Sequence, residues 1–298
     1  MIFLVIGTFI RDEIINISGE SVQSLGGLCH TISPLMAFAT KEDVIIPVCN
    51  AGSDLREEIE EFLKLSPNIC PDGIRYLNRP NNKVCLHYTS QSERIEKSLY
   101  PLPPLEYDAV EPFLNVDVLI MNMISGWDIT LKDFKKIRAK FKNKIFLDFH
   151  SLALGRKNDG SRYYKTCDDQ RDWLNQSDYI QMNENEFLTA GGKLDTPEKF
   201  IRDYINKNDV ILTITLGKKG SLTIIRNDQY FQTLWIDAAH NINVIDPTGC
   251  GDVFIGAFAL KYMYTFNIES AAQYANRIAA LAGSAKGLAR PLYLHKNI

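Results

Sequence analysis

A short glycine-rich segment near the C-terminal end of the chain has the residue types of an anion-binding turn. Asp246-Pro247-Thr248-Gly249-Cys250-Gly251-Asp252 follows the apolar pair Val244-Ile245 and precedes an apolar helical pattern over 253–264. Two glycines that flank one small residue let the backbone turn tightly and present its N–H groups. Because these amides lie at the start of a predicted helix, where the dipole favours negative charge, Gly249, Cys250 and Gly251 are predicted to form a phosphoryl cradle.

Asp252 closes this segment and adds a proton acceptor to the cradle. A carboxylate can accept the proton of an attacking hydroxyl, and phosphoryl transfer needs little else besides positioning and charge neutralisation. The alternative is an ordinary turn in which Asp252 is the N-cap of the helix, since such caps are common. The whole seven-residue string between a strand and an apolar helix is far more specific than Gly-x-Gly-Asp alone, so it favours a catalytic loop.

The string Asp-Pro-Thr-Gly-Cys-Gly-Asp-Val-Phe, residues 246–254, resembles the C-terminal signature of the ribokinase-like (PfkB) carbohydrate kinases. That signature usually has alanine at the position of Cys250. The resemblance implies one ribokinase-like kinase domain over 1–298, ATP as phosphoryl donor, Mg²⁺ as cofactor, and a sugar or sugar-like small molecule as acceptor. It implies that Asp252 is the catalytic base and that the amides of Gly249–Gly251 form the anion hole. It leaves a monovalent cation open as a further cofactor.

Asn183-Glu184-Asn185-Glu186 directly follows an apolar run and is similar to the family's N-x-x-E motif. The resemblance implies that Glu186 and Asn183 hold a hydrated magnesium ion near the phosphates. Mg²⁺ keeps several of its waters, so a sparse motif is physically sensible. The alternative is a helix cap at Asn183 with Glu186 as its capping-box partner.

Thr215-Leu216-Gly217-Lys218-Lys219-Gly220 resembles the family's nucleotide-binding turn, T-x-G-x-x-G. The resemblance implies that Thr215, Gly217 and Gly220 bind the nucleotide. The alternative is a strand-to-hairpin turn, in which glycine is expected anyway. The helical segment 270–287 is rich in small residues and, by the same resemblance, borders the adenine pocket with Asn276 as a contact.

The acceptor side follows the family less closely. Asp12 after the first strand, together with Gly26 and Gly27, matches the family's substrate-binding aspartate and glycine pair. Thr31 stands where the family usually has asparagine, and His150 stands shortly after Asp148 in place of an expected asparagine. A structural histidine is the favoured interpretation of His150, with a contact to substrate or phosphate as the alternative.

These departures leave the acceptor open. A sugar kinase is the leading hypothesis, and a nucleoside or another hydroxylated metabolite is the alternative acceptor. A second class is a catalytically silent relative that binds a nucleotide or metabolite as a regulator. The intact Gly249–Asp252 segment argues against a catalytically silent regulator.

Apolar, β-rich runs alternate with amphipathic helical patterns along the chain. This alternation predicts an α/β fold: a doubly wound, mostly parallel sheet flanked by helices. The predicted strands are residues 2–7, 44–48, 116–121, 144–148, 178–182 and 210–216, and the predicted helices are 55–65, 131–141 and 197–205.

Two regions interrupt this alternation. Residues 74–77 and 84–88, separated by a turn signal, predict a hairpin, and 14–18 with 22–25 predict two short strands. We expect these segments, within about 14–25 and 73–100, to form a small inserted sheet that acts as a lid and excludes water. Such sheets often pair between subunits in the family, so a homodimer through the lid is consistent with its exposed edges. Later, 221–225 and 230–234 predict a second hairpin.

Composition excludes several other classes of protein. The 298 residues are 45% hydrophobic and 23% charged, which is typical of a globular protein with a large core. A net charge of −3 without a basic block gives no electrostatic support to a nucleic-acid or membrane-surface role. Six cysteines without a C-x-x-C pair favour reduced thiols in the cytoplasm. The apolar first residues lack the basic region of a signal peptide, and no P-loop or Rossmann glycine motif occurs.

Overall fold

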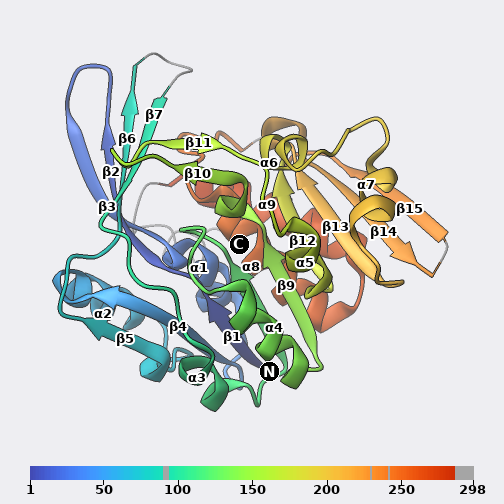
Figure 1. Cartoon of the computed structure of the whole chain (residues 1–298), viewed down its shortest axis with the longest axis horizontal. Helices are drawn as coiled ribbons and strands as arrows, with labels where there is room; N and C mark the ends of the chain where they lie inside the picture. Colours follow the sequence, from blue (N-terminus) through green and yellow to red (C-terminus); the bar gives the residue numbers. More distant parts are fainter. Residues whose placement is uncertain (90–93, 229, 241, 286–298) are drawn as a thin grey trace.

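A twisted mixed sheet runs through the centre of the protein (Figure 1). The computed structural model describes residues 1–89, 94–228, 230–240 and 242–285. Within these residues nine strands pair in the order β15-β14-β13-β12-β9-β8-β1-β4-β5; the pairs from β13 to β5 are parallel, and the pairs β13–β14 and β14–β15 are antiparallel. The strand bounds are β1 Ile2–Ile6, β4 Val44–Gly52, β5 Ile74–Leu77, β8 Val118–Asn122, β9 Lys144–Asp148, β12 Tyr179–Asn183, β13 Val210–Thr215, β14 Ser221–Asn227 and β15 Tyr230–Ile236.

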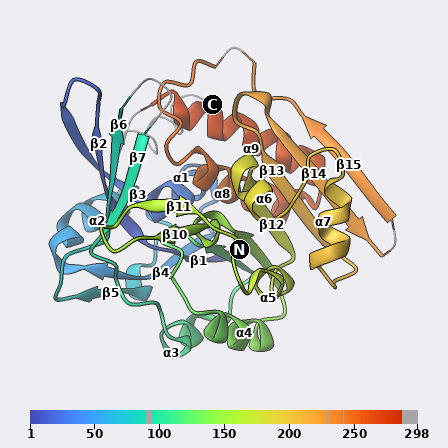
Figure 2. The ribbon, with the colours of Figure 1, turned by 45° about the horizontal axis from the view of Figure 1, so that its top comes forward.

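Helices cover both faces of this sheet, which explains why the central strands are apolar runs without alternation (Figure 2). In β1, Phe3 and Val5 belong to one buried cluster while Leu4 and Ile6 belong to the other. The first cluster packs against α1 (Leu28–Phe38), α2 (Arg56–Leu63), α8 (Cys250–Thr265) and α9 (Ile268–Gly283). The second packs against α3 (Tyr107–Val110), α4 (Leu131–Lys140), α5 (Gln170–Asn175), α6 (Glu184–Thr189) and α7 (Pro197–Tyr204).

The predicted α/β fold class is therefore confirmed, and the six predicted central strands and three predicted helices each coincide with an observed element. Their boundaries differ by a few residues, and β4 runs on to Gly52. The predicted helix over 270–287 begins earlier, at Ile268, and its last two residues lie outside the described part of the chain. No helix among the described residues combines the length and the apolar character that crossing a bilayer requires.

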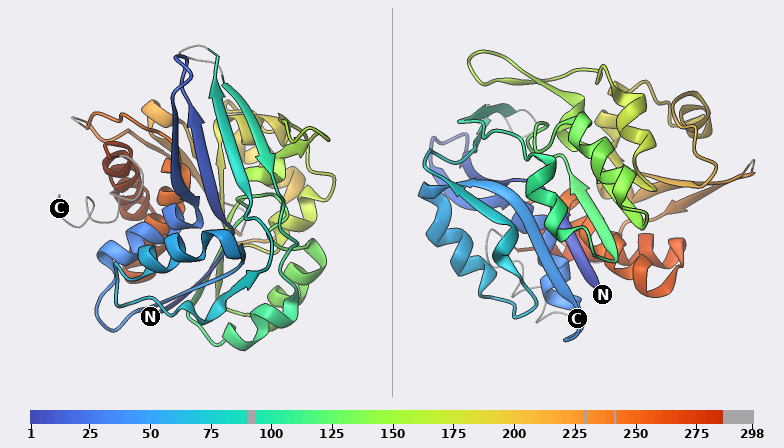
Figure 3. Two further views of the ribbon diagram at one scale, coloured as in Figure 1. Left: turned by 90° about the vertical axis from the view of Figure 1, so that its left-hand side faces the viewer. Right: turned by 60° about the horizontal axis from the view of Figure 1, so that its bottom comes forward.

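A second, smaller sheet projects from one end of the central sheet (Figure 3, left). Its strands in the described chain pair in the order β3-β2-β6-β7. β2 and β3 are antiparallel, β2 and β6 are parallel, and β6 and β7 are antiparallel. We call this unit the projecting sheet; its bounds are β2 Phe9–Ile15, β3 Ser21–Gly27, β6 Lys83–Tyr88 and β7 Arg94–Leu99. A short hairpin, β10 (Leu154–Arg156) with β11 (Arg162–Tyr164), lies next to β7.

The prediction that 74–77 and 84–88 pair as a hairpin is wrong. β5 pairs with β4 at the edge of the central sheet, whereas β6 joins the projecting sheet between β2 and β7. The turn residues between the two segments indicate where one strand ends and the next begins. They do not indicate which strand either segment pairs with. Ile74 and Tyr76 pack against the central core, and this burial places β5 there. The second predicted hairpin is confirmed as β14–β15.

Candidate active site

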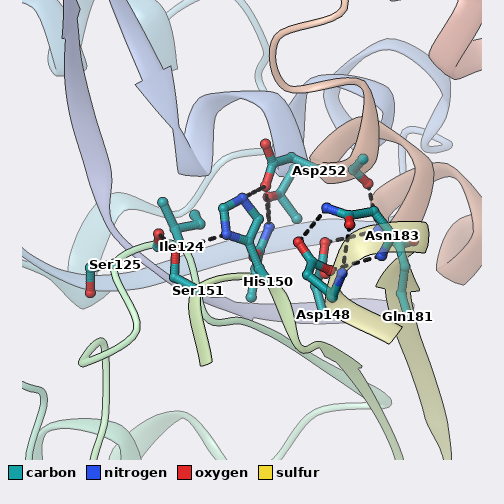
Figure 4. Close-up of polar contacts among 12 residues, drawn as sticks. Ile124, Ser125, Asp148, His150, Ser151, Gln181, Asn183 and Asp252 are labelled. Carbon is teal, nitrogen blue, oxygen red and sulfur yellow. Dashed lines mark hydrogen bonds and ion pairs between the residues drawn. The ribbon is translucent and has the colours of Figure 1, made fainter. Parts of the chain in front are cut away.

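Polar side chains gather at the carboxyl edge of the central sheet, where the N-terminus of α8 meets β8, β9 and β12 (Figure 4). Asn122 ends β8 and lies opposite Asp148, which ends β9. Asp148 in turn lies opposite Gln181 of β12. Since ligands of open parallel sheets bind at this edge, these neighbours mark the candidate site.

The glycine-rich loop makes the tight turn that its sequence predicts. Gly249 is the N-cap of α8 and has a left-handed backbone, φ 73°. A Cβ at this position would lie 2.3 Å from Cδ2 of His30, so only glycine fits. A Cβ at Gly251 would meet only Nε2 of Gln181, at 3.7 Å. The backbone can therefore be approached closely at Gly251, in the first helical turn, where N–H groups have no partner within the helix.

Cys250 makes contacts that the sequence did not reveal. Its backbone N–H donates to the carbonyl of Pro247 at 3.1 Å, so this amide stabilises the turn itself. Its thiol lies 3.4 Å from the carbonyl oxygen of Ala279 in α9 and packs close to Gly283. The small residue predicted here thus fits against the neighbouring helix, and the same contact fixes the loop on α9.

Asp252 is the third residue of α8 and is only 6% exposed. Its Oδ1 accepts a hydrogen bond from Nδ2 of Asn122 at 2.7 Å, and Nδ2 also donates to Oγ1 of Thr31 at 2.9 Å. Nε2 of His150 lies 3.9 Å from the same Oδ1. The carboxylate is therefore oriented by side chains from other elements. The alternative in which Asp252 is the N-cap is wrong, because Gly249 occupies that position.

Buried carboxylates accumulate beside this loop. Asp148 is 2% exposed, and burial raises its pKa well above the usual range, with a further rise from Glu186 and Asp252. Burial likewise raises the pKa of Glu186. Nε2 of Gln181 donates to Asp148 at 2.8 Å and to the carbonyl of Gly251 at 2.8 Å, so it ties β9 and β12 to the glycine loop.

The N-x-x-E motif forms the capping box that was its structural alternative. Oδ1 of Asn183 accepts from the backbone of Glu186 at 2.9 Å, and Oε2 of Glu186 accepts from the backbone of Asn183 at 2.8 Å. Within the described residues, no group of three or more histidine, cysteine or carboxylate side chains is arranged to hold a metal ion. Burial disfavours the ionised forms of Asp148 and Glu186, and a cation bound beside them would offset that cost; a hydrated Mg²⁺ needs few protein ligands. The residues present fit such an ion.

The nucleotide-turn residues separate into two kinds. Thr215 ends β13 directly opposite Asn183, and Gly217 has φ 57° with open space where its Cβ would be. Gly220 has φ 93°, and a Cβ there would lie 2.0 Å from the carbonyl oxygen of Ile236, so it serves the turn into β14. Asn276 of α9 donates to Oγ of Ser221 at 3.1 Å and thereby holds α9 against the β14–β15 hairpin.

The residues predicted to bind the acceptor meet at the base of the projecting sheet. Asp12 lies in β2 and is 7% exposed, next to the strand β3 that contains Gly26. A Cβ at Gly26 would lie 1.8 Å from Oδ2 of Asp12, so the glycine makes room for the carboxylate. Gly27 has φ 62° and is the N-cap of α1. One turn further on, Thr31 connects this region through Asn122 to Asp252.

Sequence reasoning did not single out Asn122 or Gln181, and it favoured a structural role for His150, which stays a prediction. Each is a polar residue at or near the end of an apolar strand, and that was the available signal. Their importance depends on strands that are distant in sequence and adjacent in the sheet, which a single segment does not reveal.

Comparison with known proteins places the chain in a family. The model of the pfkB family of carbohydrate kinases matches residues 137–293, just over half of the chain. The chain belongs to this family. A deoxyribokinase of Salmonella typhimurium is 26% identical over 171 residues, which are 54% of each chain. A nucleoside kinase of Methanocaldococcus jannaschii is 30% identical over 114 residues, 38% of this chain and 35% of the relative. The match therefore spans about half the length of the deoxyribokinase and about a third of the length of the nucleoside kinase.

Solved structures of the family share the whole fold. A ribokinase from Giardia lamblia superposes with a TM-score of 0.76 over 98% of this chain and 97% of its own, at 16% identity. The nucleoside kinase of Methanocaldococcus jannaschii gives a TM-score of 0.71 over 100% and 99% of the two chains, at 18% identity. At such low identity these similarities show the fold, and the activity has to be argued from the site.

Proposed function

We propose that this pfkB-family protein is an ATP-dependent phosphotransferase that phosphorylates a hydroxyl group of a sugar or sugar-like small molecule. One observation carries the proposal: the buried carboxylate of Asp252 lies in the first turn of α8, beside the glycine loop, and is oriented by Asn122. A proton acceptor and an anion-binding helix N-terminus side by side are what hydroxyl-to-phosphate transfer requires. Membership of a carbohydrate kinase family supports the same reaction.

In this mechanism the acceptor hydroxyl loses its proton to the Asp252 carboxylate as its oxygen bonds to the γ-phosphorus of ATP. The bond from that phosphorus to the β–γ bridging oxygen breaks, and ADP leaves. Within the Gly249–Gly251 loop, the backbone N–H groups of Gly249 and Gly251 stabilise the charge on the transferred group, since the N–H of Cys250 donates to the carbonyl of Pro247. Asp12 binds hydroxyl groups of the acceptor, with Gly26 and Gly27 allowing its close approach to the backbone.

The donor, ATP, is proposed to bind to residues of the C-terminal half of the chain. Thr215 and Gly217 are close to the strand end at Asn183, and Gly217 has room beside it for a ribose or phosphate. A sugar kinase from Pyrococcus horikoshii with the same fold has been solved in complex with ATP, at 16% identity. Glu186 and Asn183 would hold hydrated Mg²⁺ through water, and the ion would neutralise phosphate charge.

The projecting sheet is proposed to act as a lid, because Asp12 lies within it and is therefore carried with it toward the acceptor. Closure would exclude water and suppress idle ATP hydrolysis. Ile17, Val22 and Ile95 of this region are exposed by 60%, 66% and 47%, which supports pairing of two copies through it. The mass of the protein measured by light scattering would be that of a monomer if this pairing does not occur.

The decisive experiment is a screen for ADP release with ATP and Mg²⁺ against sugars, polyols and nucleosides. We expect one class of acceptor to raise ADP release well above the background without acceptor. A nucleoside hit would favour the nucleoside kinase alternative, which the Methanocaldococcus jannaschii relative supports. No acceptor-dependent release in any class, with ATP binding retained in a direct binding assay, would favour a silent nucleotide-binding regulator and contradict the proposal.

A further inference from the structure

The hairpin β10–β11 connects the two larger sheets of the protein. It begins directly after the 3₁₀ turn His150–Ala153, which follows β9 of the central sheet, and it extends to the base of β6 and β7 (Figure 1). There Ser161, next to β11, forms a bridge with Lys97 of β7, which is the outer strand of the projecting sheet in the described chain. The hairpin therefore follows the central sheet in sequence and covers an edge of the projecting sheet by contact.

Ser98 of β7 is the residue that the hairpin holds. Its backbone N–H donates to the carbonyl oxygen of Gly160 at 2.9 Å, and its own carbonyl oxygen accepts from Nε of Arg156 at 2.8 Å. Gly160 has a left-handed backbone, φ 87°, and a Cβ there would lie 2.9 Å from the carbonyl oxygen of Ser98. The turn of the hairpin is therefore shaped for close contact with β7.

Ser98 lies in the same cross-strand row as Asp12. Ser98 pairs with Val84 of β6, and Val84 pairs with Asp12 of β2. Residues opposite one another in paired strands have their side chains on the same face of the sheet. A contact that holds Ser98 in place therefore holds the row that contains the carboxylate predicted to bind the acceptor.

Arg162 of β11 fastens the hairpin to the central sheet. Its Nη1 donates to the carbonyl oxygen of Ser125 at 3.0 Å, in the loop that follows β8. The guanidinium also lies over the ring of Trp127, 5.2 Å from the ring centroid. One side chain thus joins the hairpin to the carboxyl edge of the central sheet, where the candidate site lies.

This attachment is only lightly favoured. Nε and Nη2 of Arg162 are buried and have no hydrogen-bond acceptor within the part of the chain that the structure describes. Burial without partners is unfavourable for a guanidinium. Burial also lowers the pKa of Arg162, and the carboxylates of Glu96 on β7 and of Asp128 oppose this shift. One hydrogen bond and one stacking contact therefore act against a desolvation cost, which suits a contact that forms and breaks.

We propose that Arg162 is a positioning residue for the acceptor: it fastens the β10–β11 hairpin to the central sheet, and the hairpin holds the row of the projecting sheet that contains Asp12. The proposal rests on the proposed roles of Asp12 in acceptor binding and of the projecting sheet as a lid. With Arg162 engaged, Asp12 is held beside the candidate site. With Arg162 released, the hairpin and the projecting sheet move together, so that acceptor enters and product leaves.

Hydrogen–deuterium exchange of the protein without nucleotide, metal or acceptor tests this connection separately from catalysis. Arg162→Leu removes the hydrogen bond to Ser125, and loss of a hydrogen bond from a charged group shifts such an equilibrium by roughly tenfold or more. We expect amide exchange to rise in the hairpin, 154–164, and also in β7, including Ser98. Unchanged exchange in β7 overturns the proposal, because a purely local role of Arg162 would affect only its own surroundings.

Gly160→Ala tests the same connection from its other end and changes no charge. The added Cβ must displace the carbonyl of Ser98, so exchange in β7 should rise. If the hairpin acts as one unit, exchange should rise as well in the loop 125–128, where Arg162 is fastened. A rise confined to β7 contradicts the proposal, and this variant decides the question if circular dichroism shows that Arg162→Leu is not folded.

Arg171→Leu is the matched control for Arg162→Leu. Arg171 in α5 also donates a hydrogen bond to a backbone carbonyl, that of Asp203, but it lies away from the hairpin. Its loss should leave exchange in β7 and in 154–164 unchanged. A rise in β7 in this variant would mean that the exchange reports general destabilisation, and the role of Arg162 would then be contradicted.

Steady-state kinetics with the acceptor found in the screen tests the functional half. Arg162→Leu should raise KM for the acceptor by roughly tenfold, the scale of the lost hydrogen bond, and should leave KM for ATP unchanged. It should also raise ADP release without acceptor, since a projecting sheet that is not fastened admits water. Arg171→Leu should change none of these values. Effects of equal size on both KM values contradict the positioning role.

The two measurements separate the possible failures. If no acceptor is phosphorylated, the proposed function fails, and deuterium exchange still decides whether Arg162 fastens the projecting sheet. If an acceptor is phosphorylated while a folded Arg162→Leu variant has normal exchange in β7 and a normal KM for the acceptor, the kinase activity stands and the positioning role of Arg162 is wrong.

Discussion

The donor side and the acceptor side of the candidate site are built in different ways. On the donor side, each group comes from a contiguous run of residues: 246–252, 183–186 and 215–220. On the acceptor side, single residues from separate elements meet, namely Asp12 of β2, Gly26 of β3, Thr31 of α1, Asn122 of β8 and His150 after β9. The donor side follows the family pattern, and the departures from it lie on the acceptor side.

This difference has a physical origin. A phosphate cradle needs backbone N–H groups at a helix N-terminus, which a tight local turn supplies. Recognition of an acceptor needs side chains from several directions, so its residues must be brought together by the sheet. The motifs proposed for the donor therefore carry the proposal of phosphoryl transfer, while the identity of the acceptor depends on contacts across elements. Four experiments can break or sharpen this comparison.

Asp252→Asn should have the largest effect, because it removes the proton acceptor while keeping the shape. We expect kcat to fall by ~100-fold or more, the usual scale for loss of a general base. Steady-state ADP release with the acceptor identified in the screen measures it. Asp209→Asn, an exposed carboxylate immediately before β13, is the control. Near-normal turnover of Asp252→Asn would show that the loop is not the catalytic centre.

Gly26→Ala should act on the acceptor side alone. The added Cβ would lie 1.8 Å from Oδ2 of Asp12 and must displace that carboxylate. A displacement of about 1 Å can cost up to ~100-fold in rate, so we expect a large rise in KM for the acceptor and an unchanged KM for ATP. Asp12→Asn should reproduce this pattern with the backbone intact. Equal effects on both KM values would mean that the two sides are not separable.

Gly249→Ala and Gly251→Ala form a matched pair on the donor side. At Gly249 the new Cβ would be 2.3 Å from His30 in a left-handed backbone, and the unfolding free energy should fall by about 1–3 kcal/mol. At Gly251 the Cβ has room and the backbone is helical, so stability should change little. Urea denaturation compares the two variants. Equal destabilisation would contradict the close approach of His30 to the loop.

Asn276→Ala should have the smallest effect. Its amide bridges α9 to Ser221 and to the carbonyl of Ile236, and loss of such hydrogen bonds costs ~1 kcal/mol of unfolding free energy. Thermal unfolding measures it, with the exposed Gln273 of the same helix changed to alanine as control. A rise in KM for ATP without any loss of stability would instead indicate a direct nucleotide contact, as the family resemblance implies.

Much of the fold could be predicted, because burial on both faces of the sheet gives apolar runs that are visible in sequence. The position of β5 could not, since 74–77 has the same local pattern whether it pairs with β4 or with β6. The capping box at Asn183 and Glu186 shows a related limit. One short motif can cap a helix and also present a carboxylate, and its sequence does not separate these roles.

The sequence by itself determined the fold class, the glycine loop and the position of Asp252, because each depends on residues within a few positions of one another. Tertiary structure alone decided how Asp252 is held. Asn122 at the end of β8 and His150 just after β9 precede it by more than a hundred residues, and parallel pairing of β8 with β9 brings them together beside it. Pairing between distant strands is set by burial of the whole sheet, so no local pattern encodes it.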